Sequence, residues 1–401
     1  MVLTYFVDYQ YHKSMELFNT TEIRISRTSK PKKPRLGRYE RIADIEDKIH
    51  DPFKTWVEKK DFQKPLIKYN FVDLFCGCGG LTQGFFQSGM NPVGSVEIVE
   101  VAANTHKLNF PNCKCFNGDI KDLQPIQYFY NDCIQLVIGG PPCQGYSVAG
   151  KRDPNDPRNK LFYEFVRIVE ELKPWYIVLE NVPGILTMKG GAVREAIKYE
   201  FSLIGYNMSV AVLESANYGV PQFRPRAIFI GNRFGLPNYF PSPQYSRENY
   251  VPIESAISDL SPDVPDPAIN HEWTKHSKEF MKRISKVPPG GSLYEKFFDA
   301  FKRQYPNLPC MTIKENHGGT HIHPHLNRCI SAREMARLQT FPDSFFFTGS
   351  MKKAMWQIGN AVPPLLGENI GKAVVTGLNR IHKRDFSYKP ENINQGILEF
   401  L

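Results

Sequence analysis

The stretch that decides the fold is residues 71–80, Phe-Val-Asp-Leu-Phe-Cys-Gly-Cys-Gly-Gly, in which an apolar run ends in closely spaced glycines. A short apolar run is typical of a buried strand, and the glycines after it let the backbone turn tightly and approach a ligand. Their spacing is not the Gly-x-Gly-x-x-Gly of dinucleotide-binding enzymes, and no Lys-Ser or Lys-Thr pair follows as in a phosphate-binding loop. The turn therefore favours an adenosine ligand without phosphates.

Further apolar runs follow this strand and alternate with helical stretches. The expected strands are residues 71–75, 93–97, 136–138, 176–180, 208–214 and 227–230, and the expected helices between them are 161–172 and 193–204. This alternation gives a parallel sheet with helices on both faces. We therefore predict a doubly wound α/β domain over residues 69–231.

The rest of the chain divides into three parts. Residues 232–330 are rich in Pro, His and Ser, with broken apolar periodicity. A structureless loop of that length is not expected inside a compact fold, so we predict a smaller, irregular second domain that extends to residue 350. It includes an amphipathic helix at 331–341. Residues 351–401 are expected to return to the first domain, with a final helix at 359–378 that is entered through the turn Gly-Asn-Ala-Val-Pro-Pro. Residues 1–68 are expected to form a basic N-terminal extension.

The charge distribution is uneven. The formal net charge is +9, and residues 1–70 hold 15 Lys and Arg against 10 Asp and Glu. The excess agrees with a polyanionic partner, but the basic run from Arg24 to Arg38 is more typical of a solvated, flexible arm than of a dedicated nucleic-acid contact. Charge alone therefore does not make this a DNA-binding protein.

Compartment and membrane association follow from other signals. No run reaches the roughly 18 to 20 apolar residues of a membrane span, and the first residues lack the order of a secretory signal. Eight cysteines are few for 401 residues and suit a reducing compartment without disulfides. We expect a cytoplasmic protein.

One cysteine lies where reacting groups are found in α/β folds. The strand at 136–138 runs into Gly139-Gly-Pro-Pro-Cys-Gln-Gly-Tyr-Ser147. A lone cysteine is ordinarily a buried small hydrophobe. Cys143, however, follows two prolines in a glycine-flanked loop just beyond the carboxyl end of a central strand. Cys143 is therefore a candidate nucleophile.

Acidic and basic residues end other strands. Glu97 can accept hydrogen bonds from ribose hydroxyls and Asp119 from an adenine amino group, although each alone is also typical of a turn or helix cap. Glu180 follows five largely apolar residues, so burial would raise its pKa for proton donation unless it forms a structural ion pair. Arg224 and Arg226 are two residues apart in an extended segment, so their side chains point to the same side. Two guanidinium groups on one side suit a phosphate or a base carbonyl.

Six motifs together resemble the cytosine-C5 DNA methyltransferases of bacterial or phage restriction-modification systems. They are residues 71–80, the Pro-Pro-Cys-Gln loop, Glu180-Asn-Val, Gln222-x-Arg-x-Arg, residues 333–343, and Gln357-Ile-Gly-Asn-Ala-Val-Pro-Pro. Any one motif could arise by accident, whereas six in the family's order and spacing form a specific signal. The match runs from residue 69 to about residue 380.

The resemblance implies a Rossmann-like, S-adenosylmethionine-dependent methyltransferase domain, at 69–231, and a target-recognition domain at 232–350. It implies Cys143 as nucleophile, Glu180 as the acid at the pyrimidine N3, and Arg226 with Arg224 as the groups that hold the base. The implied cofactor-binding residues are Asp73, Phe75, Gly77, Gly79, Gly80, Glu97, Ile98, Asp119, Ile120, Pro142, Asn360 and Val362, and the residues implied at the substrate DNA are Gln144, Ser147, Asn181 and Gln222.

The implied reaction begins when the thiolate of Cys143 adds to carbon 6 of cytosine while Glu180 protonates or hydrogen-bonds N3, which makes carbon 5 nucleophilic enough to accept a methyl group. The base must first be flipped out of the duplex. The resemblance further implies a specific short target in double-stranded DNA, a cognate restriction endonuclease acting on the same site, and a monomer near the nucleoid of a prokaryotic host.

Other interpretations remain open. A transfer RNA cytosine-C5 methyltransferase of the same fold would carry similar catalytic residues, and a DNA-binding regulator could use residues 1–68 with the enzyme fold as a scaffold. The long segment 232–330 favours DNA over transfer RNA. The sequence His321-Ile-His-Pro-His resembles metal-ligand spacing, but without a Cys-x-x-Cys pair we predict a polar loop and no metal. Cys76 and Cys78 are expected to be packing residues.

Overall fold

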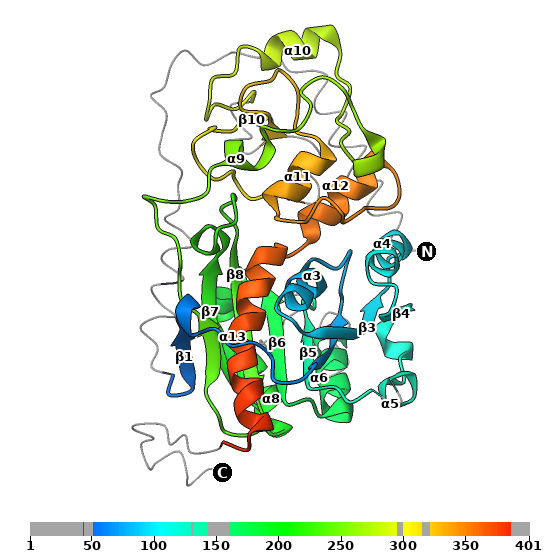
Figure 1. Ribbon diagram of the computed structural model, residues 1–401, viewed down its shortest axis with the longest axis vertical. Coiled ribbons are helices and arrows are strands. Elements are labelled where there is room, and N and C mark those ends of the chain that lie inside the picture. The colour runs from blue at the N-terminus through cyan, green and yellow to red at the C-terminus, as the bar shows by residue number, and fades with distance from the viewer. Residues whose placement is uncertain are drawn as a thin grey trace.

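The structure is a computed structural model that describes residues 51–129, 132–142, 160–294, 300–314 and 321–385, together with Ala43. A large lobe is built around one central sheet, and a smaller lobe of short helices and irregular segments lies above it in Figure 1. Helix α13 (Pro364–His382) returns the chain from the smaller lobe and packs along one face of the sheet. Among the residues described, no helix is both long and apolar enough to cross a membrane.

The central sheet confirms the doubly wound, Rossmann-like α/β fold. Over the described ranges it has seven strands in the order β4-β3-β2-β5-β6-β8-β7. Their bounds are β2 (Asn70–Leu74), β3 (Asn91–Glu97), β4 (Lys114–Asn117), β5 (Leu136–Gly139), β6 (Tyr176–Asn181), β7 (Asn207–Glu214) and β8 (Pro225–Asn232). The chain leaves β2 toward β3 on one side, and β5 lies on the other side. The crevice beyond β2 and β5 is therefore the topological switch point, where such folds bind ligands.

One strand departs from the parallel sheet that the sequence predicted. Strand β8 runs antiparallel to both of its neighbours, β6 and β7. Parallel neighbours need a crossover connection of about a dozen residues or more. Residues 215–224, which join β7 to β8, hold only the short 3-10 helix η4 (Ser215–Tyr218), so the chain turns back directly. The prediction of a wholly parallel sheet is wrong at this strand.

The sheet is buried on both faces. In β5 the side chain of Val137 packs into one core, whereas Leu136 and Ile138 pack into the other, and all three are fully buried. Two-sided burial explains why this strand is continuously apolar. Helices α3 (Gly80–Gln87) and α13 cover one face; α5 (Pro125–Tyr128), α6 (Lys160–Leu172), α7 (Gly184–Thr187) and α8 (Ala192–Leu203) cover the other. Helix α4 (Glu100–Asn109) packs beside β3 and β4.

The final helix follows the turn through which it was predicted to be entered, Gly-Asn-Ala-Val-Pro-Pro at 359–364. Helix α13 begins at Pro364 and Ala361 is extended, but Gly359 and Asn360 belong to the end of the preceding helix α12 (Met351–Asn360), which was not predicted. Proline disfavours a helical conformation in the residue before it but fits the first turn of a helix. The Pro363-Pro364 pair therefore separates α12 from α13.

Two expected domain boundaries do not coincide with breaks in the packing. Strand β1 (Lys54–Val57), from the expected N-terminal extension, pairs in parallel with β9 (Asn238–Pro241), which lies beyond the expected boundary at residue 232. Val57 and Tyr239 share a small core with Ala373 of α13. Both short strands therefore pack on the large lobe.

The smaller lobe has its own core and a firm attachment to the larger one. Its elements are α9 (Ile253–Ile257), α10 (Lys278–Ile284), α11 (Ala332–Leu338), α12, and the strand pair β10 (Lys302–Arg303) and β11 (His321–Ile322). Helix α11, expected at 331–341, starts at a capping box between Ser331 and Glu334. Apolar residues of α9, α11 and α12 form one cluster with Cys78 and Phe110, which joins the smaller lobe to the glycine turn after β2 and to the end of α4.

Candidate active site

The glycine turn after β2 has the backbone that its sequence predicted. Phe75, Gly77 and Gly79 all have positive φ angles, of 60°, 56° and 99°. A Cβ atom on Gly80 would collide with the carbonyl oxygen of Val362. The turn between α12 and α13 therefore packs directly on the glycine turn, which brings Val362 and the exposed Asn360 close to this edge of the sheet.

Glu97 stands at the end of β3 and faces this turn. Its Oε2 accepts a hydrogen bond from the Gly77 backbone N–H at 2.9 Å, and its Oε1 accepts one from the Val99 N–H at 2.7 Å. Burial raises the pKa of Glu97, and the backbone donors oppose that rise. The next residue, Ile98, is 64% exposed. An acceptor pair beside an exposed apolar side chain suits a ribose with its adjoining base.

Asp119 and Ile120 follow β4 on the same side. The Asp119 carboxylate caps the 3-10 helix η2 (Ile120–Asp122) through the Lys121 backbone N–H at 3.1 Å. Its side chain is 36% exposed and forms an ion pair with Lys121 at 3.3 Å, whereas Ile120 is buried in the core. Of this pair, Asp119 alone therefore exposes its side chain to a ligand, and it also has the capping role that the sequence left open.

The edge of the sheet carries several acids. Burial, together with the neighbouring carboxylates of Glu97 and Glu180, raises the pKa of Asp73 to about 7, against the opposing effect of hydrogen bonds from Thr82. Like charges brought together in a buried site favour a cationic ligand. The local field at the switch point is therefore complementary to a sulfonium or ammonium group.

Glu180, at the end of β6, is the centre of a second group of polar residues, next to the loop that follows β5. Its Oε1 forms an ion pair with Arg226 Nε at 2.6 Å, and both side chains are nearly buried. The loop after β5 begins beside it, because a Cβ on Gly140 would lie 2.9 Å from Glu180 Oε2. Asn181 donates a hydrogen bond to the Pro141 carbonyl at 3.0 Å. The described loop ends at the exposed Pro142; Cys143, Gln144 and Ser147 lie outside the described residues.

Two residues expected at the substrate lie instead in the packing between the lobes. Arg224 is 2% exposed, and its guanidinium donates to the carbonyl oxygens of Ile313, Gly359 and Ala361 at 2.6–2.8 Å. Gln222 is fully buried and bonds Gln339 and the Ile313 N–H. The structure therefore places Arg226 beside Glu180, whereas Arg224 and Gln222 hold segments of the two lobes together.

Sequence reasoning missed three polar residues beneath the glycine turn, Thr82, Ser95 and His106. All three are fully buried and hydrogen-bonded to one another or to Asp73. Each belongs to a different element, so no motif connects them. The only signal was a polar side chain at a position where its element is otherwise apolar.

The histidines of the 321–325 motif have partners within the protein. His323 Nδ1 accepts hydrogen bonds from the backbone N–H groups of His325 and Leu326, both at 3.1 Å. His325 contacts Glu254 at 2.9 Å, and His321 contacts the Met311 carbonyl. Within the described ranges, no group of three or more His, Cys, Asp or Glu is arranged to hold a metal ion.

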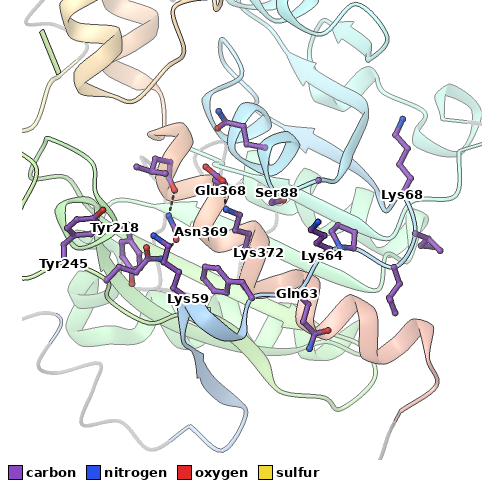
Figure 2. A pocket seen from close by; sticks show the side chains of 18 residues that line it. Lys59, Gln63, Lys64, Lys68, Ser88, Tyr218, Tyr245, Glu368, Asn369 and Lys372 are labelled. Carbon is purple, nitrogen blue, oxygen red and sulfur yellow. Dashed lines mark hydrogen bonds and ion pairs between the residues drawn. The ribbon is translucent and has the colours of Figure 1, made fainter. Parts of the chain in front are cut away.

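A cavity of about 1100 Å³ lies on another part of the large lobe. It is an open depression lined by residues 59–68, the carboxyl end of α3, the first half of α13, and Tyr218, Gln244 and Tyr245 (Figure 2). Lys59, Lys64, Lys68 and Lys372 are among its lining residues. None of the residues expected to bind cofactor or base lines it, so this cavity is separate from the candidate active site.

Comparisons with known proteins agree with this geometry. Residues 69–376 match the C-5 cytosine-specific DNA methylase family. Type II methyltransferase M.DdeI of Desulfomicrobium norvegicum is 34% identical over 384 residues, covering 80% of this chain and 92% of the relative. Type II methyltransferase M1.HphI of Haemophilus parahaemolyticus is 36% identical over 325 residues, covering 77% and 87%. A crystal structure described as a DNA modification methyltransferase encoded within a prophage (E. coli) is similar, with a TM-score of 0.65, 29% identity, and 78% of this chain and 99% of that chain covered.

The fold and the residues at its switch point define an α/β methyltransferase. The chain belongs to the C-5 cytosine-specific DNA methylase family and is a DNA (cytosine-5)-methyltransferase of the restriction-modification type. Of the alternatives that the sequence left open, the family supports the DNA enzyme over the transfer RNA enzyme.

Proposed function

We propose that the chain transfers a methyl group from S-adenosylmethionine to carbon 5 of cytosine within a specific short sequence of double-stranded DNA, through a covalent bond between Cys143 and carbon 6. The observation that carries this proposal is the placement of the Glu180–Arg226 pair directly beside Gly140, three residues before Cys143. An acid and the start of the nucleophile's loop thus meet at the edge of the sheet where α/β enzymes act.

The residues at the switch point fit S-adenosylmethionine. Gly77 and Gly79 have the positive φ angles of a tight turn, Glu97 offers two carboxylate oxygens, and Ile98 exposes an apolar side chain. The acids at this edge suit a cation better than a phosphate. When bound, S-adenosylmethionine supplies the electrophilic methyl group that carbon 5 accepts. The proposed contact residues are Phe75, Gly77, Gly79, Gly80, Glu97, Ile98, Asp119, Ile120, Pro142, Asn360 and Val362. Asp73 is 1% exposed, so it would act on the cofactor through the glycine turn.

The chain's own residues activate the base. The thiolate of Cys143 forms a bond to carbon 6, and a proton carried by Glu180 passes to N3, so electron density moves to carbon 5 and Glu180 becomes the carboxylate that pairs with Arg226. Arg226 orients this carboxylate toward the ring. After methylation, water takes the carbon 5 proton, the double bond re-forms as the Cys143 thiolate leaves, and N3 returns its proton to Glu180. Asn181 positions this loop through the Pro141 carbonyl.

The ring face must be open to Cys143, so the cytosine has to leave the duplex. The smaller lobe stands above the carboxyl edge of the sheet (Figure 1). We assign target recognition to it, because side chains that read base edges must approach the DNA from the side of the active site. Methylation of a short sequence would protect it from a cognate restriction endonuclease, and we propose that the enzyme acts as a monomer.

The experiment that tests the proposed function is expression in a bacterium without DNA methylation, followed by mapping of 5-methylcytosine at base resolution. We expect one short sequence to be methylated at a single cytosine. Cys143→Ser is the matched control and should leave the same DNA unmethylated. Methylation of adenine, methylation of cytosine without sequence context, or equal methylation by the Cys143→Ser variant would contradict the proposal.

A further inference from the structure

Four buried polar side chains form a continuous hydrogen-bonded chain beneath the glycine turn. Ser95 Oγ lies 3.3 Å from His106 Nδ1, His106 Nε2 lies 3.1 Å from Thr82 Oγ1, and Thr82 Oγ1 donates to Asp73 Oδ2 at 2.6 Å. These residues come from β3, α4, α3 and β2. Asp73 is 1% exposed and the other three are fully buried.

The direction of every hydrogen bond in this chain follows from its last member. The Thr82 hydroxyl has one proton and donates it to Asp73, so its oxygen must accept from His106 Nε2–H. His106 Nδ1 then carries no proton and accepts from the Ser95 hydroxyl. Burial lowers the pKa of His106 to about 3, which keeps the ring neutral, as this tautomer requires. All three donors therefore point toward the Asp73 carboxylate.

Asp73 stands where helix α3 lacks a capping side chain. The N-cap residue of α3 is Gly79, which has no side chain to accept from the first turn. The hydroxyl and the backbone N–H of Thr82, in that first turn, both lower the pKa of Asp73. A carboxylate at a helix N-terminus is stabilised by the unpaired N–H groups and the helix dipole. Asp73 thus ties the end of β2 to the start of α3, on either side of the glycine turn.

The other groups that face Asp73 disfavour its ionised form. Glu97 from β3 and Glu180 from β6 act on it as like charges. Cys76 and Cys78, in the turn itself, have pKa values raised by burial, so their thiols remain neutral. The residue of α4 that is linked to Asp73 is His106, which is neutral and hydrogen-bonds Thr82, the donor to Asp73. The hydrogen-bonded chain is therefore the main support for the charge on Asp73.

We propose that Ser95, His106 and Thr82 are positioning residues that hold the Asp73 carboxylate ionised against the first turn of α3, and that this contact fixes the glycine turn in the shape that binds the cofactor. The second half of this inference rests on the proposed use of S-adenosylmethionine; the first half does not. Asp73 acts on the cofactor through the turn, because its side chain is enclosed on all sides.

The test compares Thr82→Val, which removes the hydroxyl at nearly constant shape, with Thr82→Ser, which keeps it. The dissociation constant for S-adenosylmethionine is measured by calorimetry between pH 6 and pH 9. Without its donor, Asp73 needs a higher pH to ionise, and one unit of pKa is a factor of ten in population. With a pKa near 7 in the wild type and one unit higher in the variant, we expect Thr82→Val to bind about fivefold more weakly at pH 7, about tenfold more weakly at pH 6, and to recover by pH 9. Thr82→Ser should follow the wild type, and Ser95→Ala should shift in the same direction by less.

A second readout, the melting temperature, needs no cofactor. The folded pKa of Asp73 is raised, so its contribution to stability is present at low pH and is lost as pH rises through about 7. Loss of the donor makes ionisation costlier, so the melting temperature of Thr82→Val should fall progressively below that of Thr82→Ser between pH 6 and pH 9. Differences that are independent of pH in both readouts would overturn the inference. A wild type that binds no S-adenosylmethionine contradicts the proposed function instead. The melting curves then decide whether Ser95, His106 and Thr82 support the charge on Asp73.

Discussion

The Glu180–Arg226 pair allows a sharp test of the active-site geometry. Arg226 Nε lies 2.6 Å from Glu180 Oε1, and the two side chains are only 11% and 13% exposed, so solvent screens the pair weakly. Breaking a buried ion pair by removing one partner typically costs about 3–5 kcal/mol, because the remaining charge is left without a partner. We therefore expect Arg226→Gln to lower the free energy of unfolding by about 3 kcal/mol.

The assay is urea unfolding of Arg226→Gln, Glu180→Gln and the double variant at neutral pH. Since the double variant leaves no buried charge behind, it should recover most of the loss, and the interaction energy of the cycle should exceed about 1 kcal/mol. Lys114→Gln is the matched control. Lys114 pairs with Asp132 at 2.8 Å and is 49% exposed, so its loss should cost no more than about 1 kcal/mol. Additive effects of the two active-site variants would refute the reasoning.

Three further outcomes are expected. Cys143→Ser should abolish methyl transfer but retain DNA binding in a gel-shift assay; loss of both would point to a structural role. Gly80→Ala should weaken S-adenosylmethionine binding at least tenfold, because a Cβ there meets the Val362 carbonyl oxygen and lies 2.9 Å from Ala361 Cβ, whereas Gly184→Ala, with open space around it, should bind as the wild type does. Burial raises the pKa of Glu214 to about 7, so its contribution to stability is present at low pH and is lost as pH rises through 7. Relative to Glu214→Gln, the wild type should lose melting temperature between pH 5 and pH 8, and parallel pH profiles would contradict this assignment.

Much of the sheet could be predicted because its strands are buried on both faces. Runs such as 136–138 and 176–180 are short, apolar and followed by glycine or polar residues, which indicates both the strand and its end. The direction of β8 could not be predicted in the same way. It depends on how residues 215–224 turn back on themselves, and that conformation leaves no apolar pattern in the sequence.

The site shows the same division between local and distant information. The acids Glu97 and Glu180 were found because each ends a strand, and strand ends meet at one edge. Arg224 and Arg226 look equivalent in sequence, yet Arg224 precedes β8 and bonds carbonyls 89 to 137 residues away. Ser95, His106 and Thr82 are likewise connected only by the fold. Contacts between distant segments carry these roles, and spacing within one motif does not reveal them.

The measurement that tests the central claim most directly is covalent trapping. A duplex with 5-fluorocytosine at the methylated position is incubated with the enzyme and S-adenosylmethionine, and the denatured product is digested and examined by mass spectrometry. Because fluorine cannot leave as the proton does, we predict a stable adduct between the DNA and the peptide containing Cys143. Normal methylation of the cytosine duplex with no adduct on the fluorinated one, or an adduct on another residue, would contradict the account.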